Sequence, residues 1–291
     1  LFGWHEGARF HDPMLYQNDK PARTMTGNYG PDLYADFLSS FIERSHKRGK
    51  PFFAYFPMAL AHDVTDDLKW QVPYAPGKDR WMNYGEMIAS MDEMVGKIMG
   101  TLDRLEIRED TVVIFTGDNG TAAKSKLRHL GNKGAKYEYE KVVVTRNGER
   151  IPGGKGSLRD TGTHVPLIVS WPDTVKKGTV SDDLVDFSDW LPTLAELAGA
   201  KLDPQRPLDG QSFAGSFLNI EGPRRKFAFS ESRGGKAFVR DQRWKLYVSG
   251  KFHDVEKDPA EKKAITGDPK DKEARDAKAR LTQALEKLNF K

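Results

Sequence analysis

Two polar residues stand side by side where a buried strand is predicted to end. The segment 111–120 reads TVVIFTGDNG, so an apolar run stops at Asp118, Asn119 and Gly120. A carboxylate and an adjacent amide oxygen are hard ligands that suit Ca²⁺ or Mg²⁺. In an open parallel sheet, ligands bind beyond the carboxyl ends of the strands. Asp-Asn-Gly is also a common turn, so the tripeptide alone supports both interpretations.

A histidine follows another apolar run in the same way. PFFAYFPM (51–58) is predicted to form a short buried strand, and His62 follows it within MALAHDV. A histidine at the edge of a strand can transfer protons near neutral pH. A single histidine is more often structural, so its neighbours decide its role.

A lysine lies in a glycine-rich loop that leads into a third apolar run. The segment 153–172 reads GGKGSLRDTGTHVPLIVSWP, and Lys155 can act as a compact positive charge toward sulfate or phosphate. The loop is not a P-loop, because no serine or threonine follows Lys155 directly, and a flexible surface lysine is the simpler alternative. Hard ligands, a histidine and a lysine at three strand ends together indicate hydrolysis of a sulfate or phosphate ester.

These residues require an α/β scaffold to position them. Apolar periodicity and capping residues predict helices that alternate with strands, the order typical of a mixed, largely parallel sheet flanked by helices. The predicted helices cover residues 31–49, 84–106 and 186–199, and the predicted strands cover residues 51–58, 111–117 and 165–172. Within KVVVTRNGERI (141–151), Asn147-Gly148 between extended flanks predicts a tight hairpin.

The pattern changes after about residue 205. Three short β-like runs, KFAFSES, GKAFVRD and RWKLYVSG, precede a polar helix over residues 270–288. We therefore expect a main α/β domain over residues 1–204 and a smaller α+β subdomain with an antiparallel sheet over residues 205–291.

Composition narrows the function classes. The 291 residues are 38% hydrophobic and 30% charged with a net charge of +4, and no apolar stretch is long enough to span a membrane. The charge is mild and no nucleic-acid-binding motif appears, so a nucleic-acid partner is not expected. The chain has no cysteine, which excludes disulfides, thiolate metal sites and a cysteine nucleophile within it.

Five motifs in the same order resemble the sulfatase family, within the alkaline-phosphatase-like superfamily of hydrolases. They are KPFFAYFPMALAHDV, MDEMVGKIMGTLDRLEIREDTVVIFTGDNG, GGKGSLRDTGTHVPLIVSWP, VDFSDWLPTLAELAG with LDGQSF, and AFVRDQRWKLYV with FHDVEKDPAEKKAI. The resemblance covers nearly the whole chain and implies an alkaline-phosphatase-like fold and an arylsulfatase-like sulfuric ester hydrolase.

The resemblance assigns roles to the candidate residues. Asp118 and Asn119 match the family's Ca²⁺ ligands, with Mg²⁺ as the alternative ion. His62 matches the histidine that contacts the sulfate ester and protonates the leaving oxygen, and Lys155 matches the lysine that binds sulfate. The implied substrate is a sulfate ester of a sugar, glycan or aryl alcohol.

The chain also departs from the family pattern. His164 stands where the family usually has arginine, and no role is assigned to it; the segment 137–151 resembles an insertion that shapes the substrate pocket. The family's Cys/Ser-x-Pro-x-Arg motif, whose first residue becomes formylglycine, does not occur. We therefore expect an N-terminal region outside this chain to supply the nucleophile and further metal ligands, and the segment alone to be inactive.

Two rival functions remain at this point. One is another hydrolase of the superfamily, such as a phosphodiesterase or phosphonate monoester hydrolase. The other is an inactive module that binds sulfated glycans. The resemblance also implies an exported protein, periplasmic or secreted, although the N-terminal LFGWHEGARFHDP shows no signal-peptide pattern.

Overall fold

The computed structural model describes most of the chain as two compact units. The described residues are 9–63, 75–78, 80–130, 137–146, 148–218, 220 and 224–290. Unit 1 consists of Leu1–Thr111 with Ala123–Val142, and unit 2 consists of Val112–Ala122 with Val143–Lys291. The predicted division at residue 204 lies inside unit 2 and stays a prediction. In the described part of the chain, no helix is long and apolar enough to cross a membrane.

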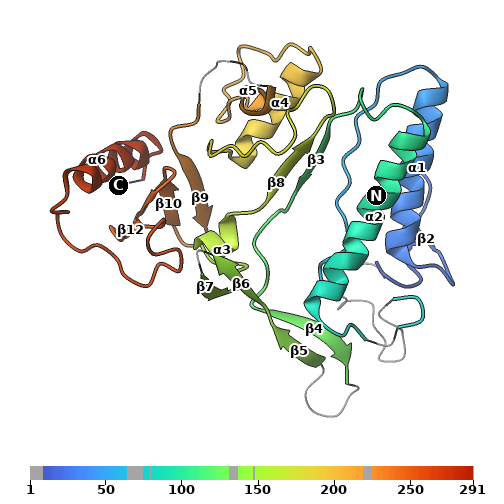
Figure 1. The fold of residues 1–291 in the computed structure, drawn as a ribbon, viewed down its shortest axis with the longest axis horizontal. Helices are drawn as coiled ribbons and strands as arrows, with labels where there is room; N and C mark the ends of the chain where they lie inside the picture. The colour runs from blue at the N-terminus through green and yellow to red at the C-terminus, as the bar shows by residue number, and fades with distance from the viewer. Residues whose placement is uncertain are drawn as a thin grey trace. The chain divides into compact units, whose positions relative to one another are not determined.

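Unit 1 is built on two long helices that pack side by side (Figure 1). Helix α1 spans Gly30–Lys47 and α2 spans Tyr84–Arg104, as the sequence predicts. The Asn83 side chain caps α2 by accepting a hydrogen bond from the Glu86 amide. A two-residue pair, β1 (Met14–Leu15) with β2 (Arg23–Thr24), precedes α1.

The segment predicted as the first buried strand does not form one. Residues 51–58 have no strand pairing, and Phe53 and Tyr55 are 68% and 81% exposed. The prediction is wrong for this chain because an apolar run becomes a strand only where a neighbour takes up its backbone hydrogen bonds. None of the described segments pairs with it.

An unpredicted hairpin completes unit 1. Strand β4 (Lys124–His129) pairs antiparallel with β5 (Tyr137–Lys141), with an irregularity between Lys126 and Arg128. The backbone amide of Val142 donates to the Ala123 carbonyl at 3.0 Å and closes the open end of the pair.

Unit 2 contains the other two predicted apolar strands. Strand β3 (Val113–Thr116) pairs with β8 (Leu167–Ser170), but the pairing is antiparallel, with Val113 opposite Ser170. Every strand pairing in the described residues is antiparallel, so these residues do not confirm the expected largely parallel sheet. Parallel neighbours need a long crossover. The connection from β3 to β8 instead contains hairpins.

One of these hairpins confirms a sequence prediction. Strand β6 (Val143–Arg146) pairs with β7 (Glu149–Pro152) across a two-residue connection in which Gly148 has φ of +78°. Asn147, the other predicted turn residue, lies outside the described residues. The positive φ explains the glycine, because other residues rarely adopt it.

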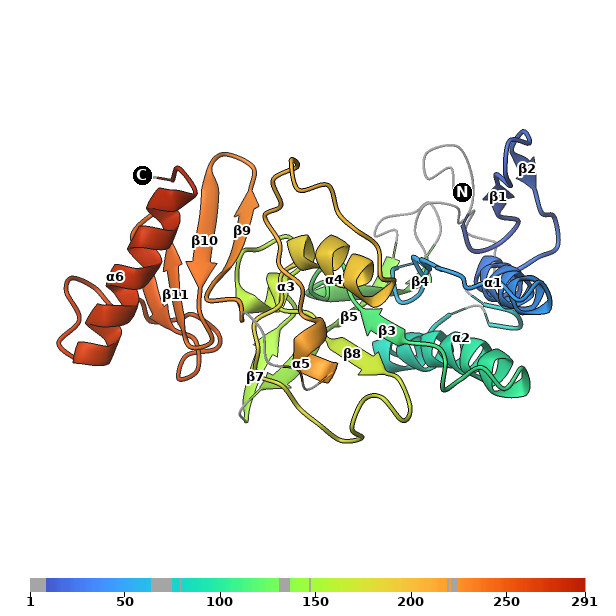
Figure 2. The ribbon, with the colours of Figure 1, turned by 90° about the horizontal axis from the view of Figure 1, so that it is seen from above.

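The remainder of unit 2 holds the short helices and the C-terminal sheet. Asp186 and Asp189 form a capping box at the start of the predicted 186–199 helix. The short helices are α3 (Asp160–Thr163), η1 (Phe187–Asp189), α4 (Trp190–Leu197) and α5 (Ala214–Leu218). The antiparallel sheet has the order β12-β11-β10-β9, and α6 (Lys272–Lys287) covers one face of it (Figure 2).

The C-terminal sheet confirms the predicted antiparallel strands and terminal helix. Its strands are β9 (Ala228–Ser232), β10 (Lys236–Arg240), β11 (Trp244–Tyr247) and β12 (Phe252–Asp254). The core between sheet and helix includes Val239, Trp244, Phe252, Leu281 and Leu285, all buried. Burial of this apolar surface holds α6 to the sheet.

Candidate functional site

The antiparallel pairing of β3 with β8 brings two of the predicted segments to one edge. Thr116, at the end of β3, is opposite Leu167, at the start of β8. The residues that follow β3 and those that precede β8 therefore lie at the same edge. Lys155 precedes its strand, so a parallel pairing would have separated it from Asp118. The observed strand direction corrects the expected one and places the two segments together.

Close backbone packing fastens the two segments. The Lys155 amide donates to the Thr121 carbonyl at 3.0 Å, and the Gly120 amide donates to the Gly162 carbonyl at 2.9 Å. A Cβ on Gly120 would lie 1.9 Å from the Thr161 carbonyl oxygen, which is too close for any other residue. Glycine at position 120 is thus required by the approach of the second segment.

The candidate side chains at this edge make no polar contact with the described part of the chain. Asp118 and Lys155 are exposed and Asn119 is half-buried. Within the described residues, none of their three side chains takes part in a hydrogen bond or ion pair. Polar side chains held on fixed backbone without internal partners are available for a ligand.

The donor set of this edge can be tested against a hard cation. A carboxylate and an amide oxygen, both without internal partners, are oxygen ligands that Ca²⁺ accepts. Among the described residues, no group of three or more histidine, cysteine, aspartate or glutamate side chains could hold a metal ion. Asp118 and Asn119 by themselves would supply only part of a Ca²⁺ shell.

His62 belongs to unit 1, and its surroundings are described there. Its side chain is exposed, and its Nδ1 lies 2.9 Å from the Asp63 carbonyl oxygen. Asp63 is itself fixed, because its carboxylate accepts hydrogen bonds from the Ser125 hydroxyl and the Lys126 amide. If Nδ1 carries the proton that binds this carbonyl, Nε2 is left as the atom that exchanges protons. The predicted convergence of His62 with Lys155, Asp118 and Asn119 stays a prediction.

A buried ionic cluster, which the sequence did not reveal, lies directly behind the Lys155 loop. We define it as Asp160, Arg240, Lys245, Tyr247 and Glu261. The Lys245 ammonium, which is fully buried, donates to the Leu158 carbonyl at 2.6 Å, to Glu261 at 2.9 Å and to Asp160 at 3.2 Å. The Arg240 guanidinium donates to Asp160 at 2.6 Å, and the Tyr247 hydroxyl donates to Glu261.

Two groups of the cluster have shifted pKa values. Burial alone would raise the pKa of the Asp160 carboxyl, but the charges and hydrogen bonds of Arg240 and Lys245 lower it to about 2. Burial and the hydrogen bond to Glu261 raise the pKa of the Tyr247 hydroxyl. The Asp160 carboxyl is therefore ionised at neutral pH, and the Tyr247 phenol stays neutral as a donor.

The cluster braces the loop from two sides. Lys245 binds the Leu158 carbonyl, and Glu261 accepts a hydrogen bond from the Asp160 amide at 3.1 Å. The C-terminal sheet therefore determines where the backbone after Lys155 runs. A sequence signal existed, since Lys245 interrupts the apolar run WKLYV, but its partners are 16 and 85 residues away.

His164, which departs from the family pattern, lies at the end of this segment. Its Nδ1 is 4.0 Å from the Asp160 carboxylate, and its side chain is 58% exposed. The imidazole therefore borders the cluster and reaches solvent.

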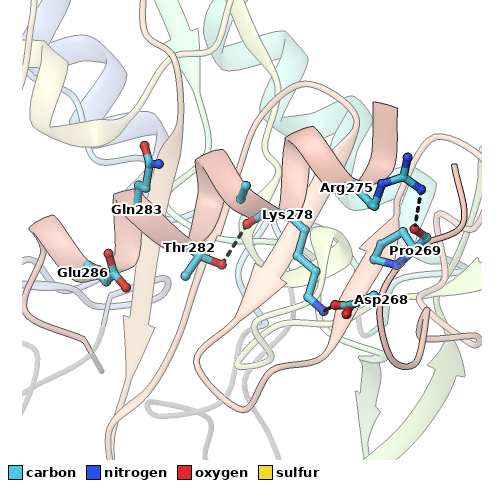
Figure 3. A pocket seen from close by; sticks show the side chains of 8 residues that line it. Asp268, Pro269, Arg275, Lys278, Thr282, Gln283 and Glu286 are labelled. Carbon is cyan, nitrogen blue, oxygen red and sulfur yellow. Dashed lines mark hydrogen bonds and ion pairs between the residues drawn. The ribbon is translucent and has the colours of Figure 1, made fainter. Parts of the chain in front are cut away.

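None of the candidate residues lines the surface groove on α6. It has a volume of about 480 Å³ and runs along α6 (Figure 3). Several of its polar groups already have partners: Arg275 donates to the Pro269 carbonyl, Thr282 donates to the Lys278 carbonyl, and Lys278 pairs with Asp268. These groups are already satisfied.

Two models of known protein families match this chain, and together they cover the segments that carry the candidate residues. The sulfatase family model matches residues 3–200, which include all four candidate residues. The chain belongs to the sulfatase family. A second model, described as N-sulphoglucosamine sulphohydrolase, C-terminal, matches residues 154–291 and so includes the ionic cluster.

Known sulfatases resemble the chain over part of their own length. Steryl-sulfatase of Mus musculus is 30% identical over 61% of this chain and 26% of its own length. N-acetylgalactosamine-6-sulfatase of Mus musculus is 29% identical over 71% of this chain and 35% of its own length. The chain thus spans about a quarter to a third of these two relatives.

A solved structure shows the same fold. The structure of BT4656 in complex with its substrate D-glucosamine-2-N,6-O-disulfate has a TM-score of 0.68 and 16% identity, covering 99% of this chain and 74% of that one. At this identity the likeness concerns the fold alone, and it supports an alkaline-phosphatase-like arrangement.

Proposed function

We propose that the full-length protein is a sulfuric ester hydrolase. The observation that carries the proposal is the edge of β3 and β8, where the Lys155 loop is bonded to the Asp118–Asn119 turn in a chain of the sulfatase family. A positive charge and two oxygen ligands, all without internal partners, are what a sulfate ester and a counter-cation require.

Lys155 and the metal ligands act on the sulfate group. The Lys155 ammonium binds a sulfate oxygen as a point charge and keeps the ester oriented. Asp118 and Asn119 hold two positions of a Ca²⁺ shell, with Mg²⁺ as the alternative ion. A bound cation withdraws electron density from the sulfate oxygens. A largely parallel central sheet, of which β3 and β8 are part, belongs to the same proposal.

His62 acts on the leaving group. With Nδ1 bound to the Asp63 carbonyl, its Nε2 donates a proton to the alcohol oxygen as the S–O bond breaks. The nucleophile in this proposal is a formylglycine from a region outside this chain, which contains no cysteine and no Ser-x-Pro-x-Arg. The segment alone is accordingly proposed to be inactive, and the protein to be exported.

The proposed substrate is a sulfated carbohydrate. The relative named N-acetylgalactosamine-6-sulfatase and the family model described as N-sulphoglucosamine sulphohydrolase, C-terminal, both name amino sugars. The name of the relative Steryl-sulfatase indicates a different alcohol. The proposal of a sulfated carbohydrate therefore rests on the second family model, which matches residues 154–291 and so includes Lys155.

The experiment compares ester classes on the full-length protein. Initial rates are measured with para-nitrophenyl sulfate and para-nitrophenyl phosphate, before and after Ca²⁺ is removed by a chelator and restored. We expect faster sulfate hydrolysis that depends on Ca²⁺ and falls in His62→Ala. Faster phosphate hydrolysis would favour a phosphoesterase. Binding of sulfated glycan that survives His62→Ala, with no hydrolysis at all, would favour an inactive module.

A further inference from the structure

One face of the β4–β5 hairpin carries three lysines and two tyrosines. Lys124 is opposite Lys141, and Lys126 is opposite Tyr139. Opposite residues of an antiparallel pair share a face, and side chains two positions apart share it too. Tyr137 therefore lies on the same face. We call this set of five residues the Lys–Tyr face.

The three lysines have no counter-ions among the residues that the structure describes. Within the described residues, no carboxylate forms an ion pair with Lys124, Lys126 or Lys141. Elsewhere in unit 1 the pattern differs, because Lys78 pairs with Glu86 and Lys97 pairs with Asp36.

The arrangement of these lysines is unfavourable without an anion. Lys124 and Lys141 face each other directly, and like charges in opposed positions destabilise a strand pair. Both side chains are exposed, so water and salt reduce the repulsion without removing it. An anion held between them would replace repulsion by attraction.

The tyrosines add flat apolar surface beside the charges. The Lys126 ammonium lies 4.6 Å from the Tyr137 ring centre, and the Lys124 ammonium lies 6.0 Å from that of Tyr139, which is 50% exposed. The two rings meet at 65°, edge toward face. Rings inclined at this angle do not form one continuous flat surface for successive stacked bases. A single exposed ring beside ammonium groups suits the C–H face of a sugar that carries anionic groups.

The opposite face anchors the hairpin to unit 1. Arg80 pairs with Glu138 at 2.8 Å, and Glu140 accepts a hydrogen bond from the Tyr84 amide at the start of α2. Ser125 and Leu127 are buried on that side. The acidic side chains of β5 are thus used internally, and the Lys–Tyr face is presented on a fixed support.

We propose that the Lys–Tyr face binds sulfated saccharide units of a glycan substrate. The choice of a sulfated glycan as the ligand rests on the proposed function. The contact itself rests on the charge complementarity between the lysines and sulfate groups. The lysines bind sulfate groups as point charges, and Tyr139 packs against a sugar ring. The face is then a specificity determinant for polymers over small sulfate esters.

The test measures equilibrium binding by the full-length protein. A heparin-derived octasaccharide, its desulfated counterpart and single-stranded DNA of equal charge are titrated against wild type and Lys124→Ala/Lys126→Ala/Lys141→Ala. We expect the triple variant to bind the sulfated octasaccharide about tenfold or more weakly. Tyr139→Ala should weaken binding to a smaller extent. Wild type should bind neither of the other two ligands as tightly.

A matched triple variant supplies the control. Lys20, Lys47 and Lys50 are exposed lysines of unit 1, so Lys20→Ala/Lys47→Ala/Lys50→Ala removes the same charge and should bind as wild type does. Equal weakening by both triple variants would overturn the site by showing a general charge effect. Unchanged binding by the Lys–Tyr variant would overturn it directly, and equal or tighter DNA binding would overturn the glycan assignment.

Activity separates this inference from the proposed function. The Lys–Tyr variant should hydrolyse para-nitrophenyl sulfate at the wild-type rate, while its KM for a sulfated oligosaccharide rises and kcat is unchanged. The two proposals can also fail separately. If the wild-type protein hydrolyses no sulfate ester, but the Lys–Tyr variant binds the octasaccharide more weakly than wild type, the proposed function fails and the binding site stands.

Discussion

The buried ionic cluster and the Lys–Tyr face use the same ammonium group in opposite ways. Lys245 is fully buried, and its three donors meet two carboxylates and a backbone carbonyl. The lysines of the Lys–Tyr face are accessible and meet no carboxylate in the described chain. A lysine with every donor satisfied maintains the fold, whereas lysines gathered without counter-ions are available for an anionic partner.

The largest expected effect comes from removing the buried lysine. Lys245→Met keeps most of the side-chain volume but leaves Arg240 as the one cation of the cluster beside two buried carboxylates. Breaking a buried ionic group in this way costs about 3–5 kcal/mol. We expect a loss of this size in the free energy of unfolding of the full-length protein, measured by urea denaturation.

The matched control is Lys236→Met, on the neighbouring strand β10. Lys236 is exposed and makes no ion pair with a described residue, so its replacement should change stability by less than about 0.5 kcal/mol. Equal effects of the two substitutions would contradict the distinction between buried and exposed lysines.

A second, smaller effect concerns pH. The folded protein lowers the pKa of Asp160 to about 2 from 3.8. The ionised Asp160 carboxyl therefore stabilises the folded protein at pH values above its unfolded-state pKa. This stabilisation is lost as the pH falls through its folded-state pKa. The difference corresponds to roughly 2 kcal/mol. Between about pH 5 and pH 2, the unfolding free energy of wild type should fall more steeply than that of Asp160→Asn. Parallel curves would show that Asp160 is not held ionised by the cluster.

The smallest effect is expected for an exposed ion pair. Lys262 pairs with Glu149 of β7, and its side chain is 64% exposed. Exposed pairs contribute about 0–1 kcal/mol. Lys262→Ala should therefore change the urea midpoint only slightly, and the change should shrink further in high salt. A loss as large as that of Lys245→Met would show that exposure does not separate the two kinds of lysine.

The sequence predicts local structure well where the signal is local. The helices α1, α2 and α6, the C-terminal strands and the β6–β7 hairpin all follow from apolar spacing, caps and turn residues. Each of these signals acts between residues that are close in the chain.

The sequence predicts poorly what depends on distant pairing. Residues 51–58 are as apolar as β3 yet find no strand partner among the described residues, and nothing in β3 or β8 indicates their antiparallel direction. The ionic cluster joins Asp160 to Arg240 across 80 residues. Residue types and their spacing along the chain indicate Lys155 and Asp118 as candidate site residues. Only the observed pairing of β3 with β8 explains why their segments lie at the same edge.

The most direct test of the central claim is the kcat/KM of the full-length protein for para-nitrophenyl sulfate with Lys155 replaced by alanine. Since the Lys155 side chain is exposed and has no partner in the described chain, thermal unfolding should be unchanged. Loss of one preorganised charge at the reacting group should lower kcat/KM about 100-fold or more, whereas the exposed control Lys177→Ala should act as wild type. Wild-type kcat/KM in Lys155→Ala would contradict a sulfate-binding role for this loop.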